Sequence, residues 1–417
     1  MTSTNRRSFL TSSAAAAFAV STGSPLYAAP PRGLLHEGFV VPANRSVQEV
    51  TTVPLAENRY WCIYGIGHRL VRKESNNGGR SWSQPKVIKT RGGKTLPLAR
   101  DTAHLSLLKL KSGKLAIVYG GPATRPGRDG TVQFSTSSDQ GKTWSTPTAV
   151  DPLFAVCRTQ AARVLSNGRI LIPVMKWISP SARGDSEGAD KNLTWSWVYY
   201  SDDEGKTWKR SLSELFVALE AGKRGVTHYE ETVVEELPNG QVLMLGRTEL
   251  GRVYKSYSKD RGETWSHPVP TPIASSYSPS TLIRIPSTKD LLLIWNQSSK
   301  EEIYRGITRH RLSTAISKDQ GNTWKHFRNL ESLDDRARID APKGRPTVLR
   351  RKPGAYGQPT DKKKYPHAPG CLRICYATAA FRKKEVAITY DYGYGVGKFK
   401  GKHATKIKVV SLDWLYS

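Results

Sequence analysis

The sequence predicts an all-β protein, and in particular a six-bladed β-propeller. Three observations predict it: an eight-residue phrase recurs along the chain, a second phrase precedes it in several units, and the chain is long enough for six units. Four strands in about sixty residues, repeated in series, is the pattern of propeller blades.

The eight-residue phrase reads Ser-x-Asp-x-Gly-x-Thr-Trp. The aspartate side chain can accept hydrogen bonds from backbone N–H groups, and the glycine allows a positive φ. Each copy therefore predicts a tight turn between two antiparallel strands. Four copies keep every letter and one is degenerate, with Asn77 in place of the aspartate. In chain order they occupy residues 75–82 (the degenerate copy), 137–144, 201–208, 258–265 and 317–324.

The second phrase is Leu-x-x-Gly followed by an apolar run, and it begins at Leu110, Leu165 and Leu237. This pattern is typical of a hairpin. Together the two phrases give each unit two hairpins, or about four strands. Residues 35–417, at about 64 residues per unit, make six units, and the last unit lacks the eight-residue phrase.

The N-terminus has the layout of a twin-arginine export signal. The stretch "NRRSFL" at 5–10 is followed by the mildly apolar run "AAAAFAV" at 14–20 and then by small residues. This order predicts a signal over residues 1–29 and a periplasmic or extracellular protein. The apolar run is too short to span a bilayer, and no other segment is long and apolar enough.

The charge favours an anionic partner. The formal net charge is +29 at pH 7, which suits an acidic polysaccharide. The basic residues are spread along the chain, which argues against a nucleic-acid-binding arm. No Cys-x-x-Cys pair is present, which argues against a zinc site. We expect no metal or organic cofactor, and a monomer.

The eight-residue phrase resembles the Asp box of the sialidase (neuraminidase) superfamily, the bacterial BNR/Asp-box repeat proteins. The resemblance covers essentially all of residues 35–417 and implies six blades. It also implies a secreted glycoside hydrolase of the exo-α-sialidase type, acting on terminal acidic sugars. Asp boxes are specific for this kind of propeller and much less specific for sialidase activity.

Residues 228–265 carry a stronger resemblance, to the sialidase segment that holds the catalytic glutamate and one substrate-binding arginine. The match implies Glu231 as the glutamate and Arg247 as the arginine. The hairpin geometry leads to the same pair of residues without the resemblance. A three-residue loop over "PNG" at 238–240 pairs Val233 with Leu245 and places Glu231 directly opposite Arg247.

The resemblance also implies a chemistry. Three arginines bind the sugar carboxylate, since their forks match its geometry. A tyrosine is the nucleophile, a glutamate is its base, and an aspartate is the general acid. The segment at 306–324 resembles the one with the third arginine, which gives Arg309, with Arg311 close behind.

The sequence departs from this pattern at three places. Where the tyrosine belongs, in the run at 341–351, stand Lys343 and Gly344, with Arg345 beside them as a candidate ligand for the acidic group. No tyrosine lies between residues 304 and 356. In the region where the first arginine belongs, Arg45 is only nearby. The general acid belongs in the loop at 64–75, which offers His68 but no aspartate.

Other side chains near expected strand starts suit an acid/base site. The run at 98–110 supplies Asp101 and His104, and Tyr229 lies two residues before Glu231. The candidates for catalysis are Glu231, Asp101, Tyr229 and His68. The candidates for substrate binding are Arg247, Arg309, Arg345, Arg45 and His104.

Three functions stay open on the sequence. The first is a sialidase-type hydrolase with altered catalytic residues. The second is a propeller lectin that binds anionic polysaccharide. The third is a polysaccharide lyase on the same fold, with a tyrosine or histidine as base. The matched Glu231, Arg247 and Arg309 favour the first, and the missing tyrosine favours the other two.

Overall fold

The computed structural model describes residues 33–44, 50–56, 58–98, 104–122, 131–151, 156–177, 193–332, 334–350, 352, 371–394 and 402–417. Residues 33–417 form one compact unit. The predicted export signal, residues 1–29, lies outside the described residues. Across the described ranges, no helix combines the length and the apolar character needed to cross a bilayer.

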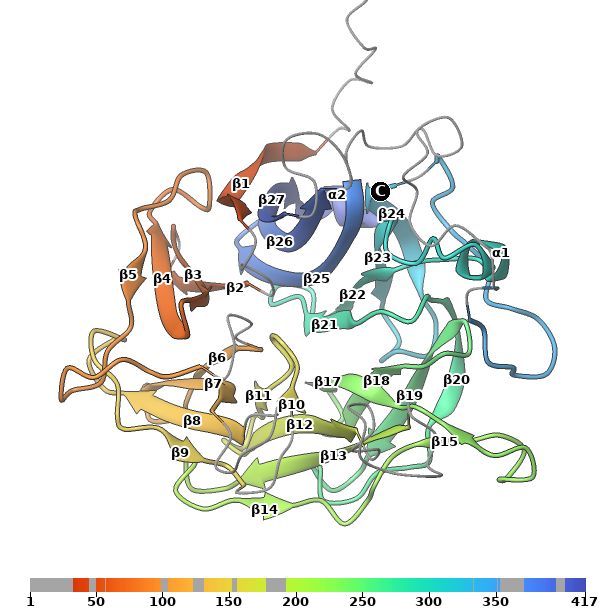
Figure 1. Ribbon diagram of the computed structural model, residues 1–417, viewed down its shortest axis with the longest axis horizontal. Coiled ribbons are helices and arrows are strands. Elements are labelled where there is room, and N and C mark those ends of the chain that lie inside the picture. The colour runs from red at the N-terminus through yellow and green to blue at the C-terminus, as the bar shows by residue number, and fades with distance from the viewer. Residues whose placement is uncertain are drawn as a thin grey trace, which may run out of the picture. The chain divides into compact units, whose positions relative to one another are not determined.

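Six antiparallel sheets are arranged in a ring (Figure 1), so the predicted six-bladed β-propeller is confirmed. We number the blades in chain order. Blade 1 consists of β2 (Thr51–Ala56), β3 (Arg59–Ile66), β4 (Arg69–Ser75) and β5 (Lys86–Val87). Blade 2 consists of β6 (Ser106–Lys109), β7 (Leu115–Gly121), β8 (Thr131–Ser137) and β9 (Thr148–Ala149).

Blade 3 has its innermost strand in two pieces that both pair with the next strand. Its strands are β10 (Val156–Cys157), β11 (Arg163–Val164), β12 (Ile170–Trp177), β13 (Thr194–Ser201) and β14 (Lys209–Arg210). Blade 4 consists of β17 (Glu230–Glu236), β18 (Val242–Arg247), β19 (Arg252–Ser258) and β20 (Val269–Ala274). A separate hairpin before blade 4 pairs β15 (Val217–Ala218) with β16 (Val226–Thr227).

Blade 5 consists of β21 (Ser280–Arg284), β22 (Leu291–Asn296), β23 (Leu312–Ser317) and β24 (Lys325–Glu331). Blade 6 consists of β25 (Cys371–Arg382), β26 (Glu385–Tyr394), β27 (His403–Ser411) and β1 (Leu34–Asn44). Two short helices complete the described chain, α1 (Lys300–Tyr304) and α2 (Leu412–Tyr416).

The two ends of the chain share blade 6. Strand β1 pairs antiparallel with β27, with Gly38 opposite Ile407 and Phe39 opposite Lys406. Figure 1 shows this contact as the red β1 beside the dark blue β27. The ring is therefore closed by hydrogen bonds between the first and last strands, and not only by side-chain packing.

The Asp boxes form the predicted turns. In the box at 201–208, an oxygen of Asp203 accepts hydrogen bonds from the backbone N–H groups of Lys206 and Thr207 at 3.0 and 2.9 Å. The hydroxyl of Ser201 donates to Asp203 at 2.8 Å and accepts from the N–H of Gly205 at 2.8 Å. Equivalent bonds surround Asp139, Asp260, Asp319 and, in the degenerate copy, Asn77.

Each box also packs against the preceding blade. A Cβ added to Gly141 would lie 2.1 Å from Cη2 of Trp61, and one added to Gly205 would lie 2.2 Å from Cε1 of Phe134. The apolar clusters of the protein likewise combine side chains of neighbouring blades. The box therefore both shapes a turn and fixes the position of one blade on the next.

The hairpin of blade 4 has the predicted loop but not the whole predicted register. Gly240 has a φ of +80°, and Val233 pairs with Leu245 as expected. Between Glu230 and Val233, however, the register shifts, so that Glu230 and not Glu231 lies opposite Arg247. The prediction of Glu231 directly opposite Arg247 is wrong, because a β-bulge inserts one extra residue near the start of β17.

Candidate active site

Four residues with a positive φ lie in or just before the innermost strands of blades 2, 3, 4 and 6. They are His104, Gln160, Glu231 and Tyr376, with φ of 40°, 55°, 46° and 56°. Such backbone is uncommon for residues other than glycine, and it is concentrated at functional sites. In blades 2, 3 and 4 these residues lie at the same end of the innermost strand, opposite the end at which the Asp boxes turn.

Glu230 holds Arg247 in place at the end of the propeller's central channel where these innermost strands begin. The Glu230 side chain is fully buried and accepts from Arg247 Nε at 2.8 Å, from Thr194 Oγ1 at 2.7 Å and from the hydroxyl of Tyr277. The guanidinium of Arg247 also stacks 3.9 Å from the ring centre of Tyr277. Burial raises the pKa of Glu230, but Arg247, Tyr277 and Thr194 together lower it below its usual value.

Glu231 lies between two arginines. Its carboxylate pairs with Nη1 of Arg247 and, at 3.3 Å, with Nη1 of Arg158. Arg158 is itself buried and contacts Nδ1 of His104 at 3.2 Å. The Glu231 carboxylate therefore links blade 4 to Arg158 of blade 3, and Arg158 in turn contacts His104, just before blade 2.

Blade 6 contributes a tyrosine to the same site. The hydroxyl of Tyr376 accepts a hydrogen bond from Arg309 Nη1 at 3.0 Å. The guanidinium carbons of Arg158, Arg309 and Arg373 lie 4.3, 5.1 and 5.2 Å from the centre of its ring. The positive charges around this phenol stabilise negative charge on its oxygen.

Arg309 differs from its neighbours in how its charge is balanced. Arg158 and Arg247 pair with glutamates, and Arg373 pairs with Asp391 at 3.0 Å. Among the described residues, no carboxylate lies within ion-pair distance of Arg309, whose side chain donates only to Tyr376 and to the Cys375 sulfur. Burial lowers the pKa of Arg309, but Cys375, Tyr376 and Glu231 raise it overall, so the side chain stays cationic.

Four predicted site residues meet at this end of the channel: Glu231, Arg247, Arg309 and His104. Arg311, named as close behind Arg309, does not join them. It is fully buried and pairs with Glu302 at 3.0 Å and with Asp334 at 3.0 Å. We therefore assign Arg309 to the site and Arg311 to the core.

Two other predicted residues, Tyr229 and Arg345, lie elsewhere, and His68 lies at this end of blade 1. Tyr229 is fully buried in an apolar cluster, with its hydroxyl on the carbonyl of Met244 at 3.3 Å, so its position does not support a catalytic role. Arg345 is 67 % exposed and pairs with Glu220. His68 is exposed in the turn between β3 and β4. Arg45 and Asp101 lie outside the described residues.

The structure adds residues that the sequence analysis missed. They are Arg158, Glu230, Tyr277, Arg373 and Tyr376. Tyr376 follows the apolar run that begins blade 6, well beyond the window in which a tyrosine was expected. Arg158 had a usable signal, because it precedes Leu165 of one Leu-x-x-Gly phrase by seven residues, much as Glu231 precedes Leu237 by six. Within the described ranges, no group of three or more His, Cys, Asp and Glu side chains is arranged to hold a metal ion.

Residues 125–368 match the BNR repeat-like domain family. The chain belongs to this family. As a BNR protein it is a member of the sialidase superfamily, in agreement with the resemblance of its Asp boxes. A sialidase from Paraclostridium sordellii is 26 % identical over 221 residues, which cover 47 % of this chain and 50 % of that sialidase. The BNR chain thus spans about half the length of the curated relative it matches.

Solved structures show the same fold as this BNR protein. A protein of unknown function from Dyadobacter fermentans has a TM-score of 0.58 at 19 % identity, covering 91 % of this chain and 98 % of that one. The sialidase of Trypanosoma rangeli has a TM-score of 0.53 at 15 % identity, covering 89 % of this chain and 56 % of that one. At these identities the likeness establishes the fold alone.

Proposed function

We propose that the protein is a sialidase-type glycoside hydrolase that acts on a terminal acidic sugar. The observation that carries the proposal is Arg309, a cation with no carboxylate partner among the described residues, hydrogen-bonded to Tyr376. An arginine of this kind binds a sugar carboxylate through paired N–H···O bonds. Arg247 and Arg373 flank it as further donors.

In this proposal Tyr376 is the nucleophile that the resemblance requires. Its oxygen attacks the anomeric carbon, the glycosidic bond breaks, and the sugar is held on the tyrosine until water releases it. A neutral phenol suits a substrate with a carboxylate beside the reacting carbon, since a carboxylate nucleophile would repel it. The guanidinium of Arg158, which contacts both Glu231 and the ring of Tyr376, links the proposed base to the nucleophile.

Glu231 is the base that accepts the phenol proton. The general acid for the leaving group stays a prediction between Asp101 and His68, of which His68 lies at the same end of its blade as the site. The export signal predicted for residues 1–29 agrees with a glycan substrate outside the cytoplasm. The location and the monomeric state also stay predictions.

The test is turnover of fluorogenic acidic glycosides, a sialoside and a glucuronide, with a neutral galactoside for comparison. We expect the purified protein to cleave an acidic glycoside and Glu231→Gln to abolish the cleavage. Glu236→Gln is the matched control, because Glu236 ends the same strand and accepts hydrogen bonds from Ser166 at the surface. Binding without turnover would favour a lectin, and an unsaturated product would favour a lyase.

A further inference from the structure

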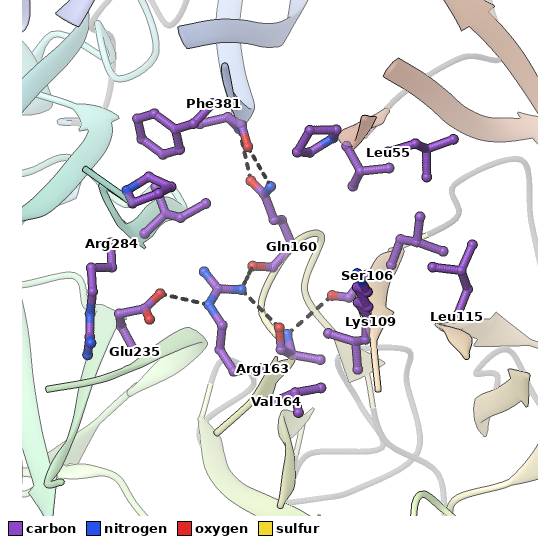
Figure 2. Close-up of a pocket in the computed structure, with 18 of the residues that line it drawn as sticks. Leu55, Ser106, Lys109, Leu115, Gln160, Arg163, Val164, Glu235, Arg284 and Phe381 are labelled. Atoms are coloured by element: carbon purple, nitrogen blue, oxygen red, sulfur yellow. Dashed lines mark hydrogen bonds and ion pairs between the residues drawn. The ribbon is translucent and has the colours of Figure 1, made fainter. Parts of the chain in front are cut away.

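The central channel has a cavity near the other end of the innermost strands. Its volume is about 680 Å³. Its lining includes Leu55 near the end of β2, Lys109 at the end of β6, Glu235 near the end of β17, Arg284 at the end of β21 and Phe381 near the end of β25. Figure 2 shows these side chains around one hollow. The candidate active site lies toward the starts of the same strands, so the two sites are separate.

A pair of hydrogen bonds lies between the two sites. The side-chain amide of Gln160 donates to the carbonyl of Ala379 at 2.9 Å and accepts from the N–H of the same residue at 2.9 Å. Figure 2 shows Gln160 reaching β25 in this way, above Arg163. The bridge joins blades 3 and 6, and both of its residues belong to the lining of the cavity.

The cavity has the character of a ligand site. Its volume falls within the range of about 300–1,000 Å³ that is typical of small-molecule pockets. Much of its wall is apolar, made by Leu55, Leu107, Leu115, Ile283 and Phe381. Pockets of this kind bind an apolar body and use a few polar groups to orient it.

The charged groups of the lining are not balanced. Arg163 is satisfied, since it pairs with Glu235 at 2.9 Å and donates to the carbonyls of Gln160 and Ala162 at 2.7 and 2.9 Å. Nε and Nη2 of Arg284 are buried and have no hydrogen-bond acceptor among the described residues. Arg59 and Lys109 add two further cations, and Glu235, already paired, is the sole carboxylate of the lining.

A buried guanidinium N–H without an acceptor is costly, and a turn of the Arg284 side chain toward the cavity lets an anionic oxygen satisfy it. We propose that this cavity is a second binding site, which takes a small organic anion: an apolar body against the leucines and Phe381, with its carboxylate or sulfate on Arg284. The site is independent of the proposed hydrolase activity, because none of these residues belongs to the cluster around Tyr376.

The test is isothermal titration calorimetry with three probes: 2-naphthoate, the neutral 2-naphthamide of similar shape, and inorganic sulfate. We expect 2-naphthoate to bind one site per chain, about tenfold more tightly than 2-naphthamide, as expected for a charge-assisted hydrogen bond. Sulfate, which lacks an apolar body, binds more weakly than 2-naphthoate. Arg284→Gln weakens 2-naphthoate about tenfold and removes its advantage over the amide.

Three variants make the result decisive. Arg261→Gln removes an exposed arginine from an Asp-box turn and controls for general attraction of anions to a basic protein. Arg309→Ala controls for binding at the other end of the channel, and Arg284→Lys keeps the charge if Arg284→Gln fails to fold. Unchanged affinity in a folded Arg284→Gln protein would overturn the proposal. So would an equal loss in Arg261→Gln, or a loss confined to Arg309→Ala.

Discussion

Arg309 donates a hydrogen bond to Tyr376 at 3.0 Å although 67 positions separate the two residues in the chain. The contact is made possible by the ring, because Arg309 precedes β23 of blade 5 and Tyr376 lies in β25 of the next blade. The backbone supports it as well, since the N–H of Ile374 donates to the carbonyl of Arg309 at 2.7 Å. The residues proposed for anion binding and for nucleophilic attack are therefore joined both by a side-chain hydrogen bond and by a backbone hydrogen bond between their segments.

Removing the Tyr376 hydroxyl is expected to stop the reaction while leaving substrate binding nearly intact. For Tyr376→Phe we predict a fall in kcat of about a thousandfold or more, because the proposed nucleophile is lost. Tyr229→Phe is the matched control, and we expect it to keep full activity. Steady-state kinetics on an acidic glycoside, with binding measured separately, checks both variants. Normal turnover in Tyr376→Phe contradicts the assignment.

Substitutions at Arg309 and at Arg311 are expected to affect different properties, ligand affinity in the first case and stability in the second. Arg309→Ala should lose acidic-ligand affinity by about tenfold or more with little change in stability, because no described carboxylate loses its partner. Arg311→Ala should lower the free energy of unfolding by about 3 kcal/mol, because it leaves the buried Glu302 carboxylate without this partner. Denaturant unfolding and ligand titration separate the two effects. Similar stability losses in both variants would argue against the distinction.

The Asp boxes predict the acid stability of the ring. Hydrogen bonds from Thr207 lower the pKa of Asp203 to about 2. A carboxyl whose pKa is lower in the folded protein than in the unfolded chain stabilises the fold at every pH above its unfolded-state pKa of about 4. This stabilisation is lost as the pH falls toward the folded-state pKa of about 2. We expect Asp203→Asn to be less stable at neutral pH and to lose less stability across this window. Denaturant midpoints along a pH series test it, and parallel curves for the two proteins would refute it.

Alanine substitutions at two glycines in turns distinguish the stability cost of backbone strain from that of lost packing between blades. Both Gly141 and Gly240 have a positive φ, but only Gly141 packs against a side chain of another blade, Trp61. Gly240→Ala should cost about 1 kcal/mol from the left-handed backbone alone. Gly141→Ala should cost about 1–3 kcal/mol more, because its methyl group overlaps the indole. Equal losses of unfolding free energy would show that the box does not hold the blades together.

Much of the fold was predictable from the sequence, because its two phrases are local. A turn signalled by Asp203 and Gly205, or a hairpin signalled by Leu237 and Gly240, depends on residues a few positions apart. Repetition of these signals set the number of blades. The pairing of β1 with β27 was not predictable in this way, since it joins strands at opposite ends of the chain and neither carries a phrase.

The site was predictable only where a phrase lay close by. Glu231 and Arg247 flank a Leu-x-x-Gly phrase, and Arg309 precedes an Asp box. Tyr376 has no such marker, because a long segment after the last box displaces it from the expected window. The bulge at Glu231 was also missed, since hairpin register extrapolated from Gly240 assumes a regular strand.

The pairing of β1 with β27 has a consequence for the order of events in folding. Tyr376 belongs to the blade whose sheet is completed by the first strand, so residues 34–44 must wait for residues 403–411 before this blade is whole. Joining strands so distant in sequence carries a large loop-closure cost and makes this step slow. The sheet that carries the proposed nucleophile is therefore expected to be completed late, only after residues 403–411 have been made.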